Sequence, residues 1–126
     1  MWDRVKDQVA LALELGMMTD KPEFDVEYIH QKLLEGKMEL MVAIDDTGAI
    51  HGSVVISYSD YPNVRIAYVV ALAGKGLCTQ ALWQEVIKLV KDNGATKIQG
   101  HDRPAMVRLL KRLGMMPRYT VMEISL

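Results

Sequence analysis

The sequence contains little of several residue types, and each scarcity excludes a class of protein. Its 126 residues include one cysteine, Cys78, so no intrachain disulfide can form and a reducing compartment is favoured. The longest strongly apolar stretch, Ile66–Gly74, is far shorter than the roughly 20 residues that cross a bilayer. Asp3 and Asp7 interrupt any apolar centre that a signal peptide would need. We therefore expect a cytoplasmic protein with no membrane partner.

Aromatic and histidine side chains are also sparse. Aromatic residues make up 6% of the sequence and no basic run is dense, which argues against nucleic acid as a partner. The histidines, His30, His51 and His101, lack the spacing of zinc ligands, and we expect no metal. Apolar residues are 50% and charged residues 25% of the chain. This composition predicts a single globular domain over residues 1–126.

Charge is distributed unevenly along the chain. Residues 1–63 hold 12 acidic and 5 basic side chains, whereas residues 64–126 hold 4 acidic and 10 basic ones. The net charges of the two halves are therefore −7 and +6. Two surfaces of opposite charge suggest two different partners. The alternative explanation is that charged side chains are spread unevenly over the solvent-exposed surface without a role in binding.

Hydrophobic periodicity predicts nine elements. A period near 3.6 indicates helices over 2–17, from Asp25 to Glu35, over Leu77–Asp92 and from Pro104 to Gly114. A period of two, or a continuous apolar run, indicates strands over Met38–Ile44, Ala49–Ser59, Val64–Leu72, Thr96–Gly100 and Arg118–Leu126. The order α-α-β-β-β-α-β-α-β predicts an α/β protein, with helices packed on a mixed α+β sheet.

The apolar positions of the predicted helices should face that sheet. They are Ile29, Leu33 and Leu34 in the second helix, Leu82, Val86, Leu89 and Val90 in the third, and Met106, Leu109, Leu110 and Leu113 in the last. Trp83 is also expected to be a packing residue. Gly36, Gly94 and Gly114 should end the helices that precede them.

A glycine-containing segment joins the third predicted strand to the third predicted helix. Gly74-Lys75-Gly76-Leu77-Cys78-Thr79 places unpaired backbone N–H groups at a helix N-terminus, where partial positive charge favours phosphate. Any strand-to-helix turn can use two glycines, so the segment by itself is a weak signal. It lacks the Gly-Lys-Ser/Thr of a Walker loop, and Thr79 stands where a dinucleotide fingerprint needs glycine.

Two short motifs and the order of elements point to a known family. Ala73-Gly74-Lys75-Gly76-Leu77-Cys78 is similar to a pyrophosphate loop of the form Gln/Arg-x-x-Gly-x-Gly/Ala, and Leu113-Gly114-Met115 is similar to a Leu-Gly-Phe segment that ends a helix before a strand. Both belong to the GNAT family of acetyl-CoA-dependent N-acetyltransferases, which the chain resembles. Ala73, Arg103 and Leu110 depart from the family's usual Gln/Arg, Asn and Tyr. The chain resembles a short member, of the kind that phages and mobile elements encode.

The resemblance implies a GNAT-like acyl-CoA N-acyltransferase fold and a transfer of acetyl from acetyl-CoA to an amine acceptor, either a small molecule or a peptide. Acetyl-CoA would lie in a splay between the strand that ends near Val70 and Ala71 and the strand Thr96–Gly100. The implied cofactor-binding residues are Val69, Val70, Ala71, Gly74, Lys75, Gly76, Leu77, Cys78, Thr79 and Arg103.

The sequence does not identify the catalytic residues. The candidates for a general acid are Tyr58, Tyr61, Tyr68 and Tyr119, which lie on or beside predicted strands. Cys78 has no partner base at recognisable spacing, so we interpret it as a small loop residue. A non-catalytic binding or assembly module is the alternative function, and a nucleotide-binding domain is a third. An open sheet edge at Met38–Ile44 or Arg118–Leu126 predicts a homodimer or incorporation into an assembly.

Overall fold

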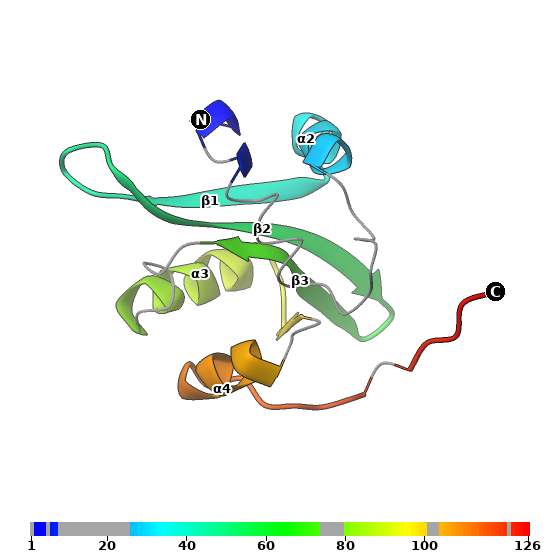
Figure 1. Ribbon diagram of the computed structural model, residues 1–126. Coiled ribbons are helices and arrows are strands. Elements are labelled where there is room, and N and C mark those ends of the chain that lie inside the picture. The colour runs from blue at the N-terminus through cyan, green and yellow to red at the C-terminus, as the bar shows by residue number, and fades with distance from the viewer. Residues whose placement is uncertain (1, 5, 8–25, 74–79, 101–103, 121) are drawn as a thin grey trace.

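One mixed sheet of four strands organises the chain, in the order β1-β2-β3-β4 (Figure 1). The computed structural model describes residues 2–4, 6–7, 26–73, 80–100, 104–120 and 122–126. The strands are β1 (Met38–Ile44), β2 (Ile50–Tyr61), β3 (Val64–Ala73) and β4 (Lys97–Gln99). The helices are α2 (Val26–Leu34), α3 (Gln80–Asp92) and α4 (Pro104–Arg112). These bounds confirm the first four predicted strands to within two residues.

The connections explain the directions of the strands. β1, β2 and β3 form an antiparallel meander, because short turns join each to the next. β4 pairs with β3 in parallel, since the chain crosses over through α3 before it returns to the sheet. β1 and β4 are the two edges of the sheet. The prediction that Met38–Ile44 is an edge strand is thereby confirmed.

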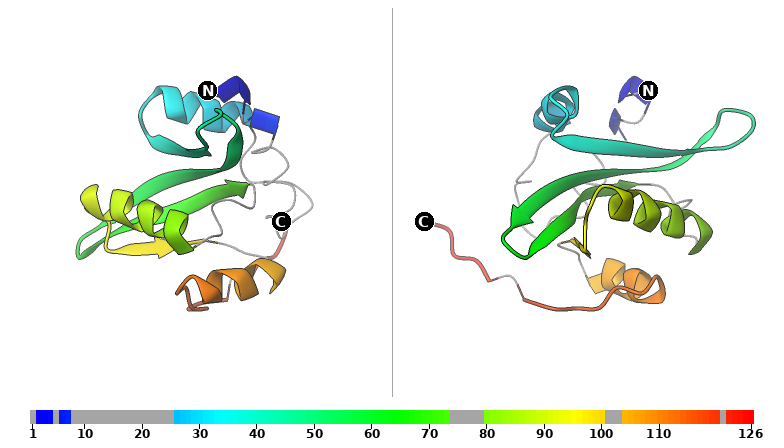
Figure 2. Two further views of the ribbon diagram at one scale, coloured as in Figure 1. Left: turned by 90° about the vertical axis from the view of Figure 1, so that its left-hand side faces the viewer. Right: turned by 180° about the vertical axis from the view of Figure 1, so that it is seen from behind.

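Helices cover both faces of the sheet (Figure 2). On one face the fully buried Ile29 of α2 packs with Met38 and Val55. On the other face the core combines Trp83 of α3 and Leu110 of α4 with strand residues. Alternate residues of β3 contribute to each cluster, as expected for a strand that is covered on both sides.

The helix ends follow the sequence closely. After α3, the N–H of Gly94 donates to the carbonyl of Lys91 and the N–H of Ala95 to that of Val90. Gly94 has φ +88°, the left-handed conformation that this cap requires. The same pair of hydrogen bonds ends α2 at Gly36 and α4 at Gly114. The predicted glycine stops are therefore confirmed.

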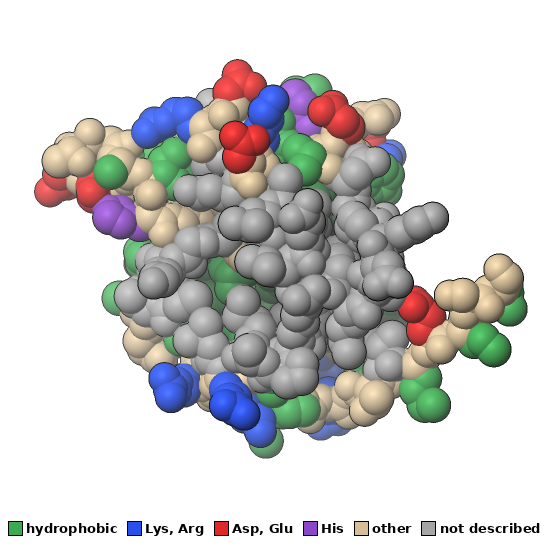
Figure 3. Space-filling view, viewed as in Figure 1, with side chains coloured by type: hydrophobic (Ala, Val, Ile, Leu, Met, Phe, Trp, Pro, Cys, Tyr) green, Lys and Arg blue, Asp and Glu red, His purple; other side chains and the backbone are tan. Residues whose placement is uncertain are grey.

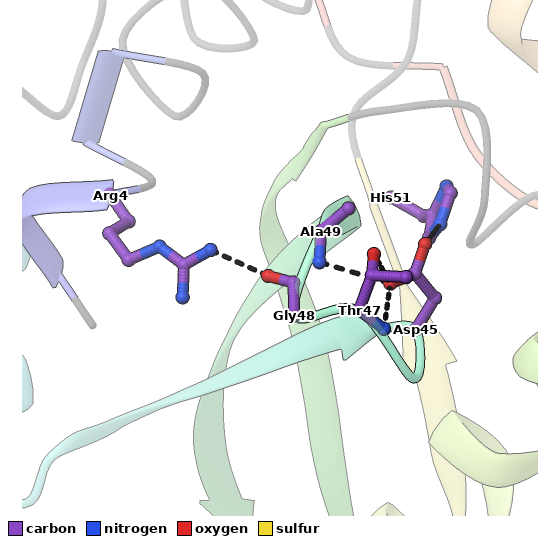
Figure 4. Close-up of polar contacts among 6 residues, drawn as sticks. All are labelled: Arg4, Asp45, Thr47, Gly48, Ala49 and His51. Atoms are coloured by element: carbon purple, nitrogen blue, oxygen red, sulfur yellow. Dashed lines mark hydrogen bonds and ion pairs between the residues drawn. The ribbon is translucent and has the colours of Figure 1, made fainter.

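The β1–β2 turn is fixed by one carboxylate (Figure 4). Oδ1 of Asp45 accepts hydrogen bonds from the N–H of Thr47 at 2.8 Å, its hydroxyl at 2.6 Å, and the N–H of Ala49 at 3.0 Å. Nε2 of His51 lies 2.7 Å from Oδ2 of Asp45. From the N-terminal segment, the guanidinium of Arg4 donates to the carbonyl of Gly48 at 2.6 Å.

Three sequence predictions need correction. Arg118–Leu126 is not a strand: its described residues pair with nothing in the sheet and are exposed, because the predicted alternation finds no neighbouring strand. Leu34 is 77% exposed, since it lies about 140° around the helix from Ile29. Leu89 is 37% exposed at the edge of the inner face of α3. Of the first predicted helix, residues 2–4 and 6–7 are helical, and 8–17 lie outside the described residues.

Candidate active site

A bulge interrupts β3 where the predicted ligand-binding residues lie. Val55 of β2 pairs with Ala71, and the next residue, Ile56, pairs with Val69, so Val70 has no counterpart on β2. Val70 and Ala71 consequently belong to the same apolar cluster, whereas regular alternation would place them on opposite faces. A bulge of this kind breaks the ladder of backbone hydrogen bonds and redirects the strand.

The parallel ladder between β3 and β4 ends beside this bulge, where β4 itself ends at Gln99, and the splay that the resemblance implies would begin here. Their parallel ladder consists of three pairs, the last of which joins Tyr68 to Gln99. Beyond it, no described residue pairs with the β4-side edge of β3 over Val69–Ala73. Backbone N–H and C=O groups along such an edge can pair with an extended ligand, as they would with an added strand.

The predicted cofactor-binding residues fall into two groups. Val69, Val70 and Ala71 are described, and the structure brings them together at the bulge and the end of the β3–β4 ladder. Val70 and Ala71 are 7% and 6% exposed, so their side chains belong to the core and only their backbone can meet a ligand. Gly74, Lys75, Gly76, Leu77, Cys78, Thr79 and Arg103 lie outside the described residues.

The four candidate tyrosines lie in different places. Tyr68 occupies the last position of β3 that pairs with β4 and packs against the cluster on the α2 face. Tyr61 is 58% exposed at the β2–β3 turn, and Tyr119 is 76% exposed beyond α4. Tyr58 lies on β2, paired with Ala67, and packs against the core cluster on the α3 and α4 face. Of the four, Tyr68 is the one that lies at the end of the β3–β4 ladder.

Tyr58 is part of a polar cluster that ties α3 to the sheet. Nδ2 of Asn93 donates to the hydroxyl of Tyr58 at 3.0 Å and to Glu39 at 2.9 Å, and the Arg65 guanidinium lies 4.5 Å from the Tyr58 ring centre. Burial raises the pKa of Tyr58, and the hydrogen bond from Asn93 partly opposes this shift. The cluster joins β1, β2, β3 and the end of α3, which is a structural role.

The acidic residues of this region are engaged away from the end of the β3–β4 ladder. Both carboxylate oxygens of Asp60 accept hydrogen bonds of 2.9 Å from Nη1 of Arg65, near the β2–β3 turn. Leu110, which stands at the family's usual acid position, is 7% exposed in the core. Within the described ranges, no cluster of His, Cys, Asp and Glu suited to a metal ion occurs.

A groove that the sequence did not predict lies along the free edge of β4. It has a volume of about 980 Å³, and α3, β4, α4 and residues 115–120 form its walls. Apolar side chains of Trp83, Ile98 and Leu113 line it, together with lysines at 91, 97 and 111. No local motif could reveal it, because the packing of α3, β4 and α4 with the residues after α4 forms its walls.

The described charged side chains are distributed unevenly over the face shown in Figure 3. Lys and Arg side chains gather along the lower edge, where Figure 1 places α4, with no Asp or Glu among them in this view. The upper edge carries most of the Asp and Glu side chains together with further Lys and Arg side chains. Separately, the described part of the chain contains no helix that is long and apolar enough to cross a membrane.

Comparison with known proteins shows a likeness of fold. No protein-family model and no curated protein matches the sequence. A predicted acetyltransferase from Clostridium acetobutylicum, solved with acetyl-CoA, matches with TM-score 0.68 and 13% identity over 97% of this chain and 86% of its own. A Trypanosoma brucei acetyltransferase matches with TM-score 0.60 and 16% identity over 96% and 94%. Glucosamine-6-phosphate N-acetyltransferase from Arabidopsis thaliana matches with TM-score 0.59 and 12% identity over 95% and 91%.

These matches show that the chain has a GNAT-like acetyltransferase fold, which confirms the resemblance of fold seen in the sequence. The chain is a divergent form of this fold, with a four-stranded mixed sheet. The expected origin in a phage or mobile element gains no support from these structures.

Proposed function

We propose that the chain is an acetyl-CoA-dependent N-acetyltransferase, a single cytoplasmic domain over residues 1–126 that acetylates an amine of a small molecule or peptide. The observation that carries the proposal is the bulge at Val70 together with the end of the β3–β4 ladder at Tyr68, which leaves the β4-side edge of Val69–Ala73 without a described partner strand. A solved neighbour with the same fold contains acetyl-CoA, which supports this choice of cosubstrate.

The described residues fit an extended, amide-containing ligand. The edge of β3 over Val69–Ala73 offers backbone groups that suit the amides of a pantetheine arm. Backbone N–H groups of Gly74–Thr79 would hold the pyrophosphate, and Lys75 and Arg103 would neutralise its charge. When bound, acetyl-CoA supplies the thioester carbonyl that the acceptor amine attacks.

Tyr68 is the residue that we assign to proton donation. Of the candidate tyrosines, it is the one that lies at the last β3–β4 pair. A tyrosine hydroxyl is protonated at neutral pH, so it can donate to a departing thiolate. The amine's own proton can pass to water, because orientation alone supplies much of the rate of such a transfer.

A non-catalytic module is the second candidate, and a specific observation favours it. β3 carries no carboxylate or histidine, Asp60 is held by Arg65, and Leu110 is buried. The conventional acid and base of a transferase are therefore missing from these positions. On this reading the chain binds acetyl-CoA and serves in a homodimer or larger assembly, with slow transfer or none.

One experiment separates these functions. Thermal unfolding is measured with acetyl-CoA, CoA, ATP and NAD, since a ligand at 100 times its dissociation constant adds about 2.7 kcal/mol of stability. Thiol release is then followed across a panel of amines. Stabilisation by acetyl-CoA with thiol release supports the transferase, and stabilisation without thiol release supports the module. Stabilisation by ATP or NAD alone supports a nucleotide-binding domain, and no effect of either CoA form overturns both proposals.

A further inference from the structure

The groove along the free edge of β4 combines a buried apolar floor with an exposed apolar rim. Trp83, Val90 and Leu113 line it and are 1%, 2% and 6% exposed, so they form its floor. Met116 and Tyr119, which follow α4, also line it and are 84% and 76% exposed. Its volume of about 980 Å³ lies at the upper end of the range of about 300–1,000 Å³ for small-molecule sites. The groove therefore has the size and the lining of a site for one small apolar ligand.

The charged side chains of the groove all have one sign. Lys91, Lys97, Lys111 and Arg118 line it and are exposed. Among the described residues that line the groove, none is Asp or Glu. None of the four cations forms an ion pair with another described residue. Cations without a counter-charge attract an anion, so the groove favours a ligand that is negatively charged as well as apolar.

The wall that α3 contributes has a direction. Trp83 lies in the first turn of α3 and Lys91 in its last, eight residues apart, which corresponds to about 12 Å along the helix axis. Ile87 lines the groove between them. After α3 the chain turns into β4, whose first residue is Lys97. This wall is therefore apolar at one end and cationic at the end that leads into β4, which matches a ligand with an anionic head and an apolar tail.

The free edge of β4 is too short to select a peptide. β4 has three residues, and successive residues of a strand direct their backbone groups to opposite sides, so at most two residues offer N–H and C=O groups on the free side. A peptide carries an amide at every residue, and each amide that enters an apolar groove without a partner costs free energy. An aliphatic chain has no such groups, and the flexible side chains of Met115 and Met116 can adapt to it.

We propose that the groove binds a free fatty acid. Its carboxylate lies beside Lys91 and Lys97, and its chain follows the apolar floor toward Trp83. The exposed side chains of Met116 and Tyr119 cover the chain from the other wall. This site does not rest on the proposed acetyl-CoA function.

Calorimetric titration of the full chain with sodium dodecanoate tests the ligand class. Decanoate, which has two methylenes fewer, should have a dissociation constant about 15-fold higher, because each buried methylene contributes about a factor of four. Dodecanol has the same chain without the charge and should bind more weakly than dodecanoate, because it leaves the cations without an anion. Absence of dodecanoate binding, or equal affinity for dodecanoate and dodecanol, overturns the proposal.

Tryptophan fluorescence tests the orientation of the chain. In Trp2→Phe, Trp83 is the only tryptophan, and a bromine atom that contacts its indole quenches the emission. We expect 12-bromododecanoate, with bromine at its tail, to quench Trp83 more strongly than 2-bromododecanoate, with bromine beside its carboxylate. In Trp83→Phe, the remaining Trp2 should be quenched by neither. Equal quenching of Trp83 by the two isomers, or none by either, contradicts the proposed orientation and site.

A pair of charge reversals on α3 locates the carboxylate. Lys91→Glu should raise the dissociation constant of dodecanoate about tenfold, because an anion at this end loses a charged partner. Lys88→Glu is the matched control: Lys88 is exposed on the same helix outside the groove, and affinity should stay within about twofold of wild type. Equal effects of the two substitutions overturn the proposal.

Two other occupants of the groove have distinct signatures. Binding to phosphatidylglycerol vesicles without binding of dodecanoate would assign the groove to a membrane surface. A dimer in light scattering that excludes dodecanoate would assign it to a second copy of the chain. Either result overturns the fatty acid site.

Discussion

Tyr68 occupies the last position of β3 that pairs with β4. Removal of its hydroxyl tests the proposed role of Tyr68 as proton donor. If it donates a proton to the departing thiolate, Tyr68→Phe should lower kcat by about 10²-fold. The KM for acetyl-CoA should change little, because backbone groups hold the ligand. Steady-state thiol release measures both constants.

Tyr61→Phe is the matched control for this substitution. It removes the same hydroxyl from a residue that is 58% exposed at the β2–β3 turn, and it should leave kcat unchanged. An unchanged kcat in Tyr68→Phe would remove Tyr68 from the mechanism while leaving acetyl-CoA binding untouched.

Asp45 shows how one ionised side chain fixes a turn. Hydrogen bonds from Thr47, then from His51 and the Ala49 N–H, hold the pKa of Asp45 well below its ordinary value of 3.8. A lowered folded-state pKa means that this contribution to stability is present above the unfolded value and is lost as the pH falls below it. Asp45→Asn should therefore destabilise the fold at pH 7, and the difference from wild type should shrink below about pH 4.

Urea midpoints at pH 7, 5 and 3 measure this dependence. Asp46→Asn is the control, because Asp46 lies in the same turn and makes no hydrogen bond within the described ranges. A difference between wild type and Asp45→Asn that stays constant down to pH 3 would show that the charge of Asp45 does not stabilise the turn.

At the scale of the elements, one fully buried side chain of α2 packs on the sheet, with the partly buried Val26 and Leu33 beside it. That side chain is Ile29, the only buried residue of α2. Ile29→Ala should cost about 2–5 kcal/mol in the free energy of unfolding, from lost burial and the cavity left behind. Leu34→Ala in the same helix should change it by less than about 0.5 kcal/mol, since Leu34 is 77% exposed. Equal losses for the two variants would contradict this packing.

The strand–glycine–helix unit gives the second prediction at this scale. On the proposed function, Gly76→Val would add a branched side chain at the pyrophosphate-binding segment, so acetyl-CoA affinity should fall below detection. The fold should persist, as judged by circular dichroism and the thermal midpoint without ligand. Calorimetric titration measures the affinity, and a dissociation constant equal to that of wild type would exclude the segment as the phosphate site.

At the scale of the whole molecule, the separation of charge predicts how ligand affinity depends on salt. Acetyl-CoA is polyanionic, and residues 64–126 carry a net charge of +6. Screening shortens the range of these interactions from about 10 Å at 0.1 M salt to about 3 Å at 1 M. The dissociation constant should therefore rise several-fold between these concentrations.

Lys75→Gln supplies the comparison for the salt dependence. Loss of the Lys75 charge should weaken acetyl-CoA binding at low salt and change it less at 1 M salt. The dissociation constant of the variant should therefore vary less with salt concentration than that of the wild type. If affinity does not vary with salt in the wild type, the basic half of the chain does not hold the anionic ligand.

The sequence by itself determined the type and the ends of most elements, because these depend on neighbouring residues. Period-two alternation placed Met38–Ile44 in a strand at the observed bounds. Gly94, at φ +88°, ends α3 where a residue without a side chain is needed. The order of these elements, together with the two short motifs, suggested the fold that the structural matches show.

Only the tertiary structure decided where backbone groups remain unpaired. The bulge at Val70 arises from the register between β2 and β3, and the β4-side edge of Val69–Ala73 lies beyond the short ladder of β3 with β4. The groove is formed by the packing of three consecutive elements, α3, β4 and α4, with the residues that follow α4. Alternation predicted a strand at Arg118–Leu126, yet a strand also needs a neighbour, and its own chain provides none for the described residues. Pairing and register depend on distant residues, and for that reason local pattern cannot determine them.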